Sequence, residues 1–226
     1  MEATRKTTQR ILKPGCTFKP LPRSFFEPAT DGVAKNLLGH LLVRHTPEGS
    51  CVVVIVEAEA YLHNDPASHT FRGPTARNRA MWGPPGHAYV YFIYGNHWCL
   101  NVVCRPVGTG EAVLIRAVEP LFGLEWMQKN RPVTNPRQLT NGPGKLCEAL
   151  AIDRSLDGLD LCDAKSPLFI ARNPSFKTFL RERGPIVTTT RIGIVKAAHL
   201  PLRFYLKESE FISRPLAGTK SNPAPA

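Results

Sequence analysis

Apolar residues along this chain either alternate with polar ones or form short unbroken runs, and both patterns are typical of β-strands. They predict strands at 40–45, 51–61, 87–94, 98–105, 112–117, 167–172, 187–194 and 203–206. Apolar residues at helical spacing predict helices at 29–38, 120–129 and 144–151. Residues 62–86 are rich in Pro, Gly and Arg, and we expect mostly loop there.

The order of these elements indicates the fold class. Short Gly- or Pro-containing turns join consecutive strands, which favours antiparallel hairpins, and the helices at 120–129 and 144–151 follow a run of strands instead of alternating with them. We therefore expect an α+β fold: a single domain with an antiparallel-rich sheet and surrounding helices. A length of 226 residues agrees with one domain. We assign it to 17–214, between a flexible basic arm at 1–16 and a flexible tail at 215–226.

Charge and cysteine content narrow the function classes. The net charge is +11 and the pI about 9.7, which favours a polyanionic partner, nucleic acid first, over a merely solvated basic surface. No apolar run approaches the roughly 20 residues that span a bilayer, so no membrane is expected. Six cysteines without a C-x-x-C pair predict reduced thiols, no metal site and a reducing compartment.

Two strand segments carry candidate chemistry. Strand alternation places Glu57, Glu59 and Tyr61 on one face of the first, and Tyr89 and Tyr91 on one face of the second. A carboxylate among apolar strand residues is either paired with a cation or functional, because burying it alone is costly. Carboxylates beside flat rings suggest an enzyme that stacks a planar ring and activates water. A structural salt bridge and plain strand packing are the alternatives.

Three further features fit a nucleic-acid partner. Tyr94 precedes a Gly-Asn turn, where an aromatic ring can serve as a wedge between base pairs. Arg77 and Arg79 lie in an arginine-rich loop suited to phosphate contacts. Lys145 stands at the start of a predicted helix, where backbone N–H groups could also hold a phosphate. Solvated charges and an ordinary capped turn are the alternatives.

Taken together, the chain resembles the alkyladenine (3-methyladenine) DNA glycosylase family. The matching segments fall in order at Val56–Tyr61, Ala67–His69, Arg77–Met81, Tyr89–Gly95, Cys99–Asn101, Leu114–Pro120, Gly142–Cys147 and Pro201–Tyr205. The resemblance implies a monofunctional glycosylase of base excision repair, without metal or cofactor. Its substrate would be double-stranded DNA with damaged purines such as 3-methyladenine, hypoxanthine or ethenoadenine, flipped out of the duplex before hydrolysis.

The resemblance also implies residue roles. Glu59 would be the general base that activates water, with Arg116 close to that water. The flipped base would contact Tyr61, His69 and Tyr91. In addition, Asn101 would disfavour guanine by clashing with its 2-amino group, and Tyr94 would fill the gap in the duplex. Asn96 and His97 after the wedge depart from relatives, which can carry apolar or aromatic residues there.

Three alternatives stay open. Glu57 lies on the same strand face as Glu59 and is the rival base. The chain could instead be a non-catalytic nucleic-acid structure-binding module, like the C-terminal domain of formyltransferases, which we expect the fold to resemble. A nucleoside hydrolase is the third, although no metal-binding aspartate cluster supports it. We expect a monomer, in the bacterial cytoplasm near the nucleoid, or in the nucleus if the source is eukaryotic.

Overall fold

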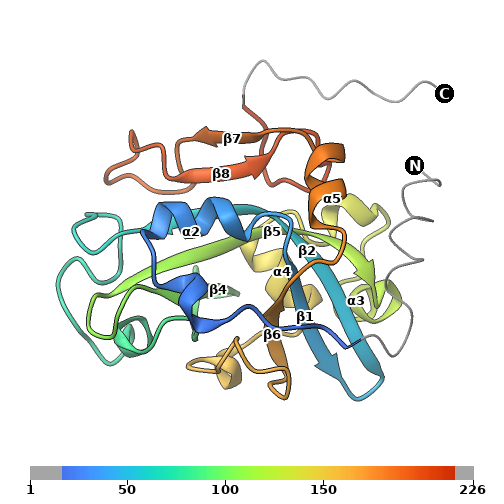
Figure 1. Cartoon of the computed structure of the whole chain (residues 1–226), viewed down its shortest axis with the longest axis horizontal. Coiled ribbons are helices and arrows are strands. Elements are labelled where there is room, and N and C mark those ends of the chain that lie inside the picture. Colours follow the sequence, from blue (N-terminus) through green and yellow to red (C-terminus); the bar gives the residue numbers. More distant parts are fainter. Residues whose placement is uncertain (1–16, 217–226) are drawn as a thin grey trace.

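A computed structural model describes residues 17–216 (Figure 1). Its strands form one eight-stranded sheet in which the order β3-β4-β5-β2-β1-β6 is a continuous path, while β8 joins β2 and carries β7. All pairs are antiparallel. The strands are β1 (Leu41–Thr46), β2 (Gly49–Tyr61), β3 (Ala88–Ile93), β4 (His97–Cys104), β5 (Glu111–Phe122), β6 (Leu168–Ala171), β7 (Ile186–Thr189) and β8 (Arg203–Leu206).

Four α-helices accompany the sheet: α2 (Thr30–Leu37), α3 (Leu124–Asn130), α4 (Pro143–Ala149) and α5 (Phe176–Glu182). Helix α2 packs on β2 and β5, and α4 packs on β4 and β5. Figure 1 shows the β7–β8 hairpin lying beside α2 at one edge of the molecule. The predicted α+β class, with a single antiparallel sheet and surrounding helices, is therefore confirmed.

The long strand β2 organises the sheet. Its first half pairs with β1, residues 57–59 pair with β8, and its other edge pairs with β5. Its residues from Cys51 to Ala60 are all buried, which explains an apolar run in place of alternation. The register with β5 shifts on both sides of Glu57, and such bulges re-aim side chains. Strand β2 thus brings Glu57 and Glu59 into the interior.

Some predicted boundaries were wrong for identifiable reasons. Residues 120–122, predicted as helix, continue β5, where Pro120 pairs with Val53. A proline is tolerated there because β4 covers only the first part of β5, which leaves that edge unpaired. The strand predicted at 187–194 ends at Thr189, and helix α5 was not predicted at all. The other predicted helices and strands are present, most with ends shifted by one or two residues.

Thiols, possible metal ligands and membrane-spanning helices can be assessed in the described residues. Cys51, Cys99, Cys104, Cys147 and Cys162 are free thiols, and all but Cys162 are buried. Across 17–216, no group of three His, Cys, Asp or Glu could hold a metal ion. No helix in this part of the chain is long and apolar enough to cross a membrane. The basic arm, Cys16 and residues 217–226 of the tail lie outside the described residues.

Candidate active site

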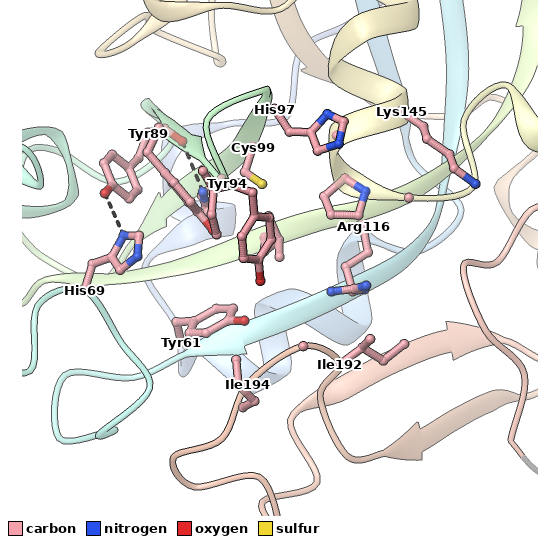
Figure 2. Close-up of a pocket in the computed structure, with 18 of the residues that line it drawn as sticks. Tyr61, His69, Tyr89, Tyr94, His97, Cys99, Arg116, Lys145, Ile192 and Ile194 are labelled. Carbon is pink, nitrogen blue, oxygen red and sulfur yellow. Dashed lines mark hydrogen bonds between the residues drawn. The ribbon is translucent and has the colours of Figure 1, made fainter.

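A cavity of about 600 Å³ opens between the β3–β4 hairpin, the ends of β2 and β5, the start of α4 and the segment 192–194. Figure 2 shows Tyr61, Arg116 and Ile192 from one side of it, and the hairpin residues Tyr89 and Cys99 from the other. The predicted residues that line it are Tyr61, His69, Tyr91, Tyr94, Asn101, Arg116 and Lys145. Chain segments far apart in sequence therefore converge on one pocket.

Aromatic rings form one wall. Tyr89 and Tyr91 alternate onto the same strand face, as predicted, with ring centroids 5.3 Å apart. His69 meets Tyr91 edge-on at 4.5 Å, and its Nδ1 shares a 2.8 Å hydrogen bond with the Tyr89 hydroxyl. Burial, and then Arg77, lower the pKa of His69, so the imidazole is neutral at neutral pH. A neutral ring can lie against a cationic base without repulsion.

The Glu59 carboxylate is fully buried at the edge of this pocket. The Tyr61 hydroxyl donates to its Oε2 at 3.0 Å, Arg116 Nη1 lies 3.2 Å from the same oxygen, and the Ile192 N–H donates to Oε1 at 2.8 Å. Glu59 does not line the cavity, but all three of these donors do. Burial raises the pKa of Glu59, while Arg116, the Ile192 N–H and Tyr61 oppose that shift.

Glu57, the rival carboxylate, is occupied elsewhere. Its Oε1 accepts from Arg203 Nε at 2.6 Å, from Ser213 Oγ at 2.8 Å and from Arg116 Nε at 3.2 Å. Its Oε2 accepts from the Ser213 N–H at 2.6 Å. Glu57 is buried and does not line the cavity. With four donors around it, this carboxylate has the environment of a structural anchor for Arg116.

Arg116 therefore joins the two carboxylates. Burial lowers the pKa of Arg116, but Glu59 and Glu57 outweigh burial and raise it overall, so the guanidinium stays charged. Its Nε binds Glu57 and its Nη1 lies against Glu59. Because one rigid fork makes both contacts, Glu57 fixes the direction in which Arg116 presents its charge to the pocket.

Tyr94 and Asn101 differ in exposure. Tyr94 is 76% exposed at the tip of the hairpin, with a left-handed backbone (φ 55°). Asn101 is buried deep in the pocket, where its Nδ2 donates to the Tyr89 carbonyl at 3.2 Å. One side chain thus projects from the protein beside the cavity, and the other is fixed against its wall.

The predicted phosphate-binding residues are not equivalent. Exposed Arg77 donates to the Phe92 carbonyl, and its guanidinium lies 6.0 Å from the centre of the Tyr91 ring. Arg79 is exposed in the 3-10 turn at 79–82 and does not line the cavity. Lys145 does line it and donates to Asn141, and burial together with Arg131 lowers its pKa.

Several residues of the site were missed at the sequence level. Ile192 contributes only a backbone N–H to Glu59, and no sequence signal marks such a donor. Arg191 and Arg131 belong to no recognised motif, so nothing distinguished them from the other arginines of this basic chain. His97 was noted only as a departure, yet it lines the cavity and packs closely on Gly144. Because residues 187–194 were predicted as one strand, the loop after Thr189 that contains Arg191 and Ile192 was not recognised.

A buried carboxylate–arginine pair beside an aromatic pocket, in a basic α+β domain, is an arrangement suited to an enzyme that holds a planar ring next to a polar group. Residues 24–210 match the family model of methylpurine-DNA glycosylase. A protein of Methanoculleus marisnigri is 54% identical over 194 residues, which cover 86% of this chain and 98% of the relative. A protein of Nitrosospira multiformis is 47% identical, with coverage of 86% and 94%. Both are named “Putative 3-methyladenine DNA glycosylase”.

The chain therefore belongs to the methylpurine-DNA glycosylase family. The resemblance predicted from the sequence is confirmed. So is the predicted enzyme class, a monofunctional DNA-3-methyladenine glycosylase of DNA repair, at the level of the family.

Proposed function

We propose that this enzyme flips alkylated or deaminated purines, such as 3-methyladenine, hypoxanthine or ethenoadenine, out of duplex DNA and hydrolyses their N-glycosylic bond. The observation that carries the proposal is Glu59, which is held by Arg116, Tyr61 and the Ile192 N–H at the edge of an aromatic pocket. Family membership supplies the reaction class, and the pocket supplies the place for the base.

The chemistry needs one base and one water. A water that enters beside Arg116 gives its proton to Glu59, and its oxygen bonds to the sugar C1′ as the bond from C1′ to the purine nitrogen breaks. The electron pair leaves with the purine, and the DNA keeps an abasic sugar. A cationic alkylated purine departs as a neutral molecule, whereas hypoxanthine or ethenoadenine would depart as an anion and needs a proton or hydrogen bonds as it leaves. Because burial raises the pKa of Glu59, its carboxylate is a stronger base than an exposed glutamate.

Stacking offsets the cost of flipping. Extrusion costs a few kcal/mol, less for a badly paired lesion, and an aromatic contact returns about 1–3 kcal/mol per base. Tyr61, His69 and Tyr91 supply the contacts within the pocket. We assign Tyr94 to the gap left in the duplex, because its ring is exposed next to the pocket. Asn101 would exclude guanine by meeting its 2-amino group.

Phosphate contacts complete the proposed complex. Lys145 at the pocket mouth and exposed Arg77 and Arg79 would hold the DNA backbone on either side of the flipped nucleotide. We further propose that the enzyme acts as a monomer where the genome is, in the bacterial cytoplasm near the nucleoid, or in the nucleus of a eukaryotic source. The likeness of the fold to a formyltransferase C-terminal domain stays a prediction.

The complete burial of Glu59 is the one observation that favours the binding-module alternative, because a paired buried carboxylate can be purely structural. Family membership weighs against that alternative. The two functions make different demands on Glu59: a catalyst needs its basic oxygen, while a binder needs only its shape and hydrogen bonds.

A single-turnover assay tests the proposal, on duplex oligonucleotides that carry one hypoxanthine or ethenoadenine, with alkali to reveal abasic sites. We expect strand breaks only after alkali, and a loss of at least about 100-fold in Glu59→Gln with lesion binding retained. Glu119→Gln is the matched control, because Glu119 is also buried and ion-paired, with Arg183, but lies outside the pocket. Normal turnover in Glu59→Gln with loss in Glu57→Gln would move the base to Glu57. Binding without any cleavage, on alkylated DNA as well, would favour the binding module.

A further inference from the structure

Arg191 is a fully buried arginine directly before Ile192, in the segment that closes one side of the pocket. Its Nη1 donates to the Ala60 carbonyl at 3.0 Å and also forms a buried ion pair with Asp65. Ala60 belongs to β2, between Glu59 and Tyr61, and Asp65 belongs to the loop that follows β2. One nitrogen therefore ties the 190–194 segment to both the catalytic strand and the adjoining loop.

The guanidinium also covers a ring. The Arg191 Cζ lies 4.7 Å from the centre of the Tyr61 ring. Tyr61 lines the cavity and Arg191 does not, so the cation supports the ring from outside the pocket. Among the described residues, no atom accepts a hydrogen bond from the buried Arg191 Nε or Nη2. An arginine in such a place is costly unless the ring face and the ion pair compensate it.

Two functional groups thus depend on one side chain. The Tyr61 ring is the proposed stacking surface for the base, and its hydroxyl donates to Glu59. The Ile192 N–H donates to the other oxygen of the same carboxylate. Since Arg191 packs on the first and is joined covalently to the second, a change in its position would displace two of the three donors to Glu59 together.

We propose that Arg191 is a positioning residue of the glycosylase, which fixes the stacking face of Tyr61 and the orientation of the Glu59 carboxylate as one unit. This inference rests on the proposed function of Glu59 and Tyr61. Arg191 would thus affect both base binding and water activation although it lies outside the pocket. Small displacements of catalytic groups lower the reaction rate strongly, so a residue that only positions them can matter for the rate.

The acid limb of the pH–rate profile is a readout that a merely structural role would leave in place. The groups that face Glu59 are Arg116 from β5, Tyr61 and Glu57 from β2, and Cys99 from β4, besides the Ile192 N–H. Displacement of that N–H would remove a hydrogen bond to the charged form, so the limb would move to higher pH.

The test compares two double variants. In Arg191→Met with Asp65→Asn, both members of the ion pair are replaced, so no buried charge is left alone. In the control, Arg183→Met with Glu119→Gln, the same kind of pair is removed. The Arg183 Cζ also lies 5.2 Å from the centre of the Phe179 ring. Arg183, Glu119 and Phe179 all lie outside the pocket. Both variants thus lose an ion pair and a cation–ring contact.

We expect the Arg191 double variant to lose about tenfold or more in single-turnover rate per folded molecule, with weaker binding of an ethenoadenine duplex and the shifted acid limb. The control should change only the melting temperature. If the double variant does not fold, Arg191→Lys serves, because it keeps a charge for Asp65 but not the planar fork, and it should show the same shifts at smaller size. Unchanged rate, binding and acid limb in a folded variant, or equal losses in the control, would overturn the inference. An inactive wild-type protein would instead contradict the proposed function.

Discussion

Tyr94 has a positive φ, which is usual for glycine, and a side chain as exposed as that of a polar loop residue. Its φ of 55° and its 76% exposed ring mean that neither backbone preference nor packing favours tyrosine there. A non-glycine residue in a strained region costs on the order of 1 kcal/mol or more. This cost in stability is explained if the ring acts on a partner outside the protein, which agrees with the proposed wedge.

Tyr94→Gly should therefore raise the free energy of unfolding by about 0.5–1 kcal/mol while lowering excision from duplex DNA. Excision from a single-stranded oligonucleotide should fall much less, because no gap has to be filled. Ala151→Gly is the control, since Ala151 also has a positive φ, of 47°, and lies outside the pocket. Denaturant unfolding and single-turnover assays measure the two effects. Equal losses on duplex and single strand would contradict the wedge assignment.

The pH dependence follows from Glu59. Its carboxylate must be deprotonated to accept a proton, and burial raises its pKa above the ordinary value of 4.5, so the rate should rise with pH through a limb placed above that value. Arg116 opposes the shift, and Arg116→Met should move the limb still higher and lower the plateau. The limb should persist in His69→Asn, because His69 titrates separately. A limb at or below 4.5 in the wild type would contradict Glu59 as the base.

Residue patterns predicted the centre of the site and not its surroundings. Strand alternation was enough to place Tyr89 and Tyr91 on one wall and Glu59 next to Tyr61, because a side chain's face in a strand depends only on parity. Arg191 and the Ile192 N–H could not be found that way. The Ile192 N–H meets Glu59 across 133 residues, and Arg191 contacts Tyr61 and Asp65, and both belong to a loop without periodicity.

At the scale of elements, the same limit appears in the strand boundaries. The segment after Val187 has strand-like composition, but β8 pairs only as far as Thr189, and the chain then leaves the sheet to reach the pocket. Residues 120–122 begin a segment with apolar residues at helical spacing, yet β2 extends far enough to pair with them. In both places the length of the partner strand decided the structure, and a local pattern carries no information about that length.

The contact between α4 and β4 gives a prediction at this scale. A Cβ on Gly144 would lie 2.9 Å from the Cγ of the His97 ring, although Gly144 is in a helix, where alanine is favoured by about 1 kcal/mol. Gly144→Ala should destabilise the protein and weaken DNA binding by displacing His97. In a His97→Gly background, which also removes the His97 Cβ that would lie 3.0 Å away, the same change should be neutral or stabilising. A double-mutant cycle of unfolding free energies measures the coupling, and additivity would contradict the contact.

At the scale of the whole molecule, the net charge of +11 predicts that DNA binding weakens as the salt concentration rises. Each phosphate contact contributes about −0.9 to the slope of log K against log salt concentration. Lys145→Ala and Arg77→Ala should each reduce the slope by about one contact, for damaged and undamaged duplexes alike. Lys177→Ala, at an exposed position of α5, should leave the slope unchanged. Fluorescence anisotropy across a salt series measures these slopes, and a slope unchanged in Lys145→Ala would remove that residue from the interface.

The Ser213 contacts with Glu57 have a consequence for biosynthesis. Strand β2, which carries Glu57 and Glu59, is made early, but β8 must pair with it and Ser213 must reach Glu57 before the network around Arg116 is complete. A chain emerging from the ribosome therefore lacks part of the network around Glu57 until Ser213 has been synthesised and has docked. We expect synthesis products that stop before residue 213 to hold Arg116 less firmly than the longer chain does.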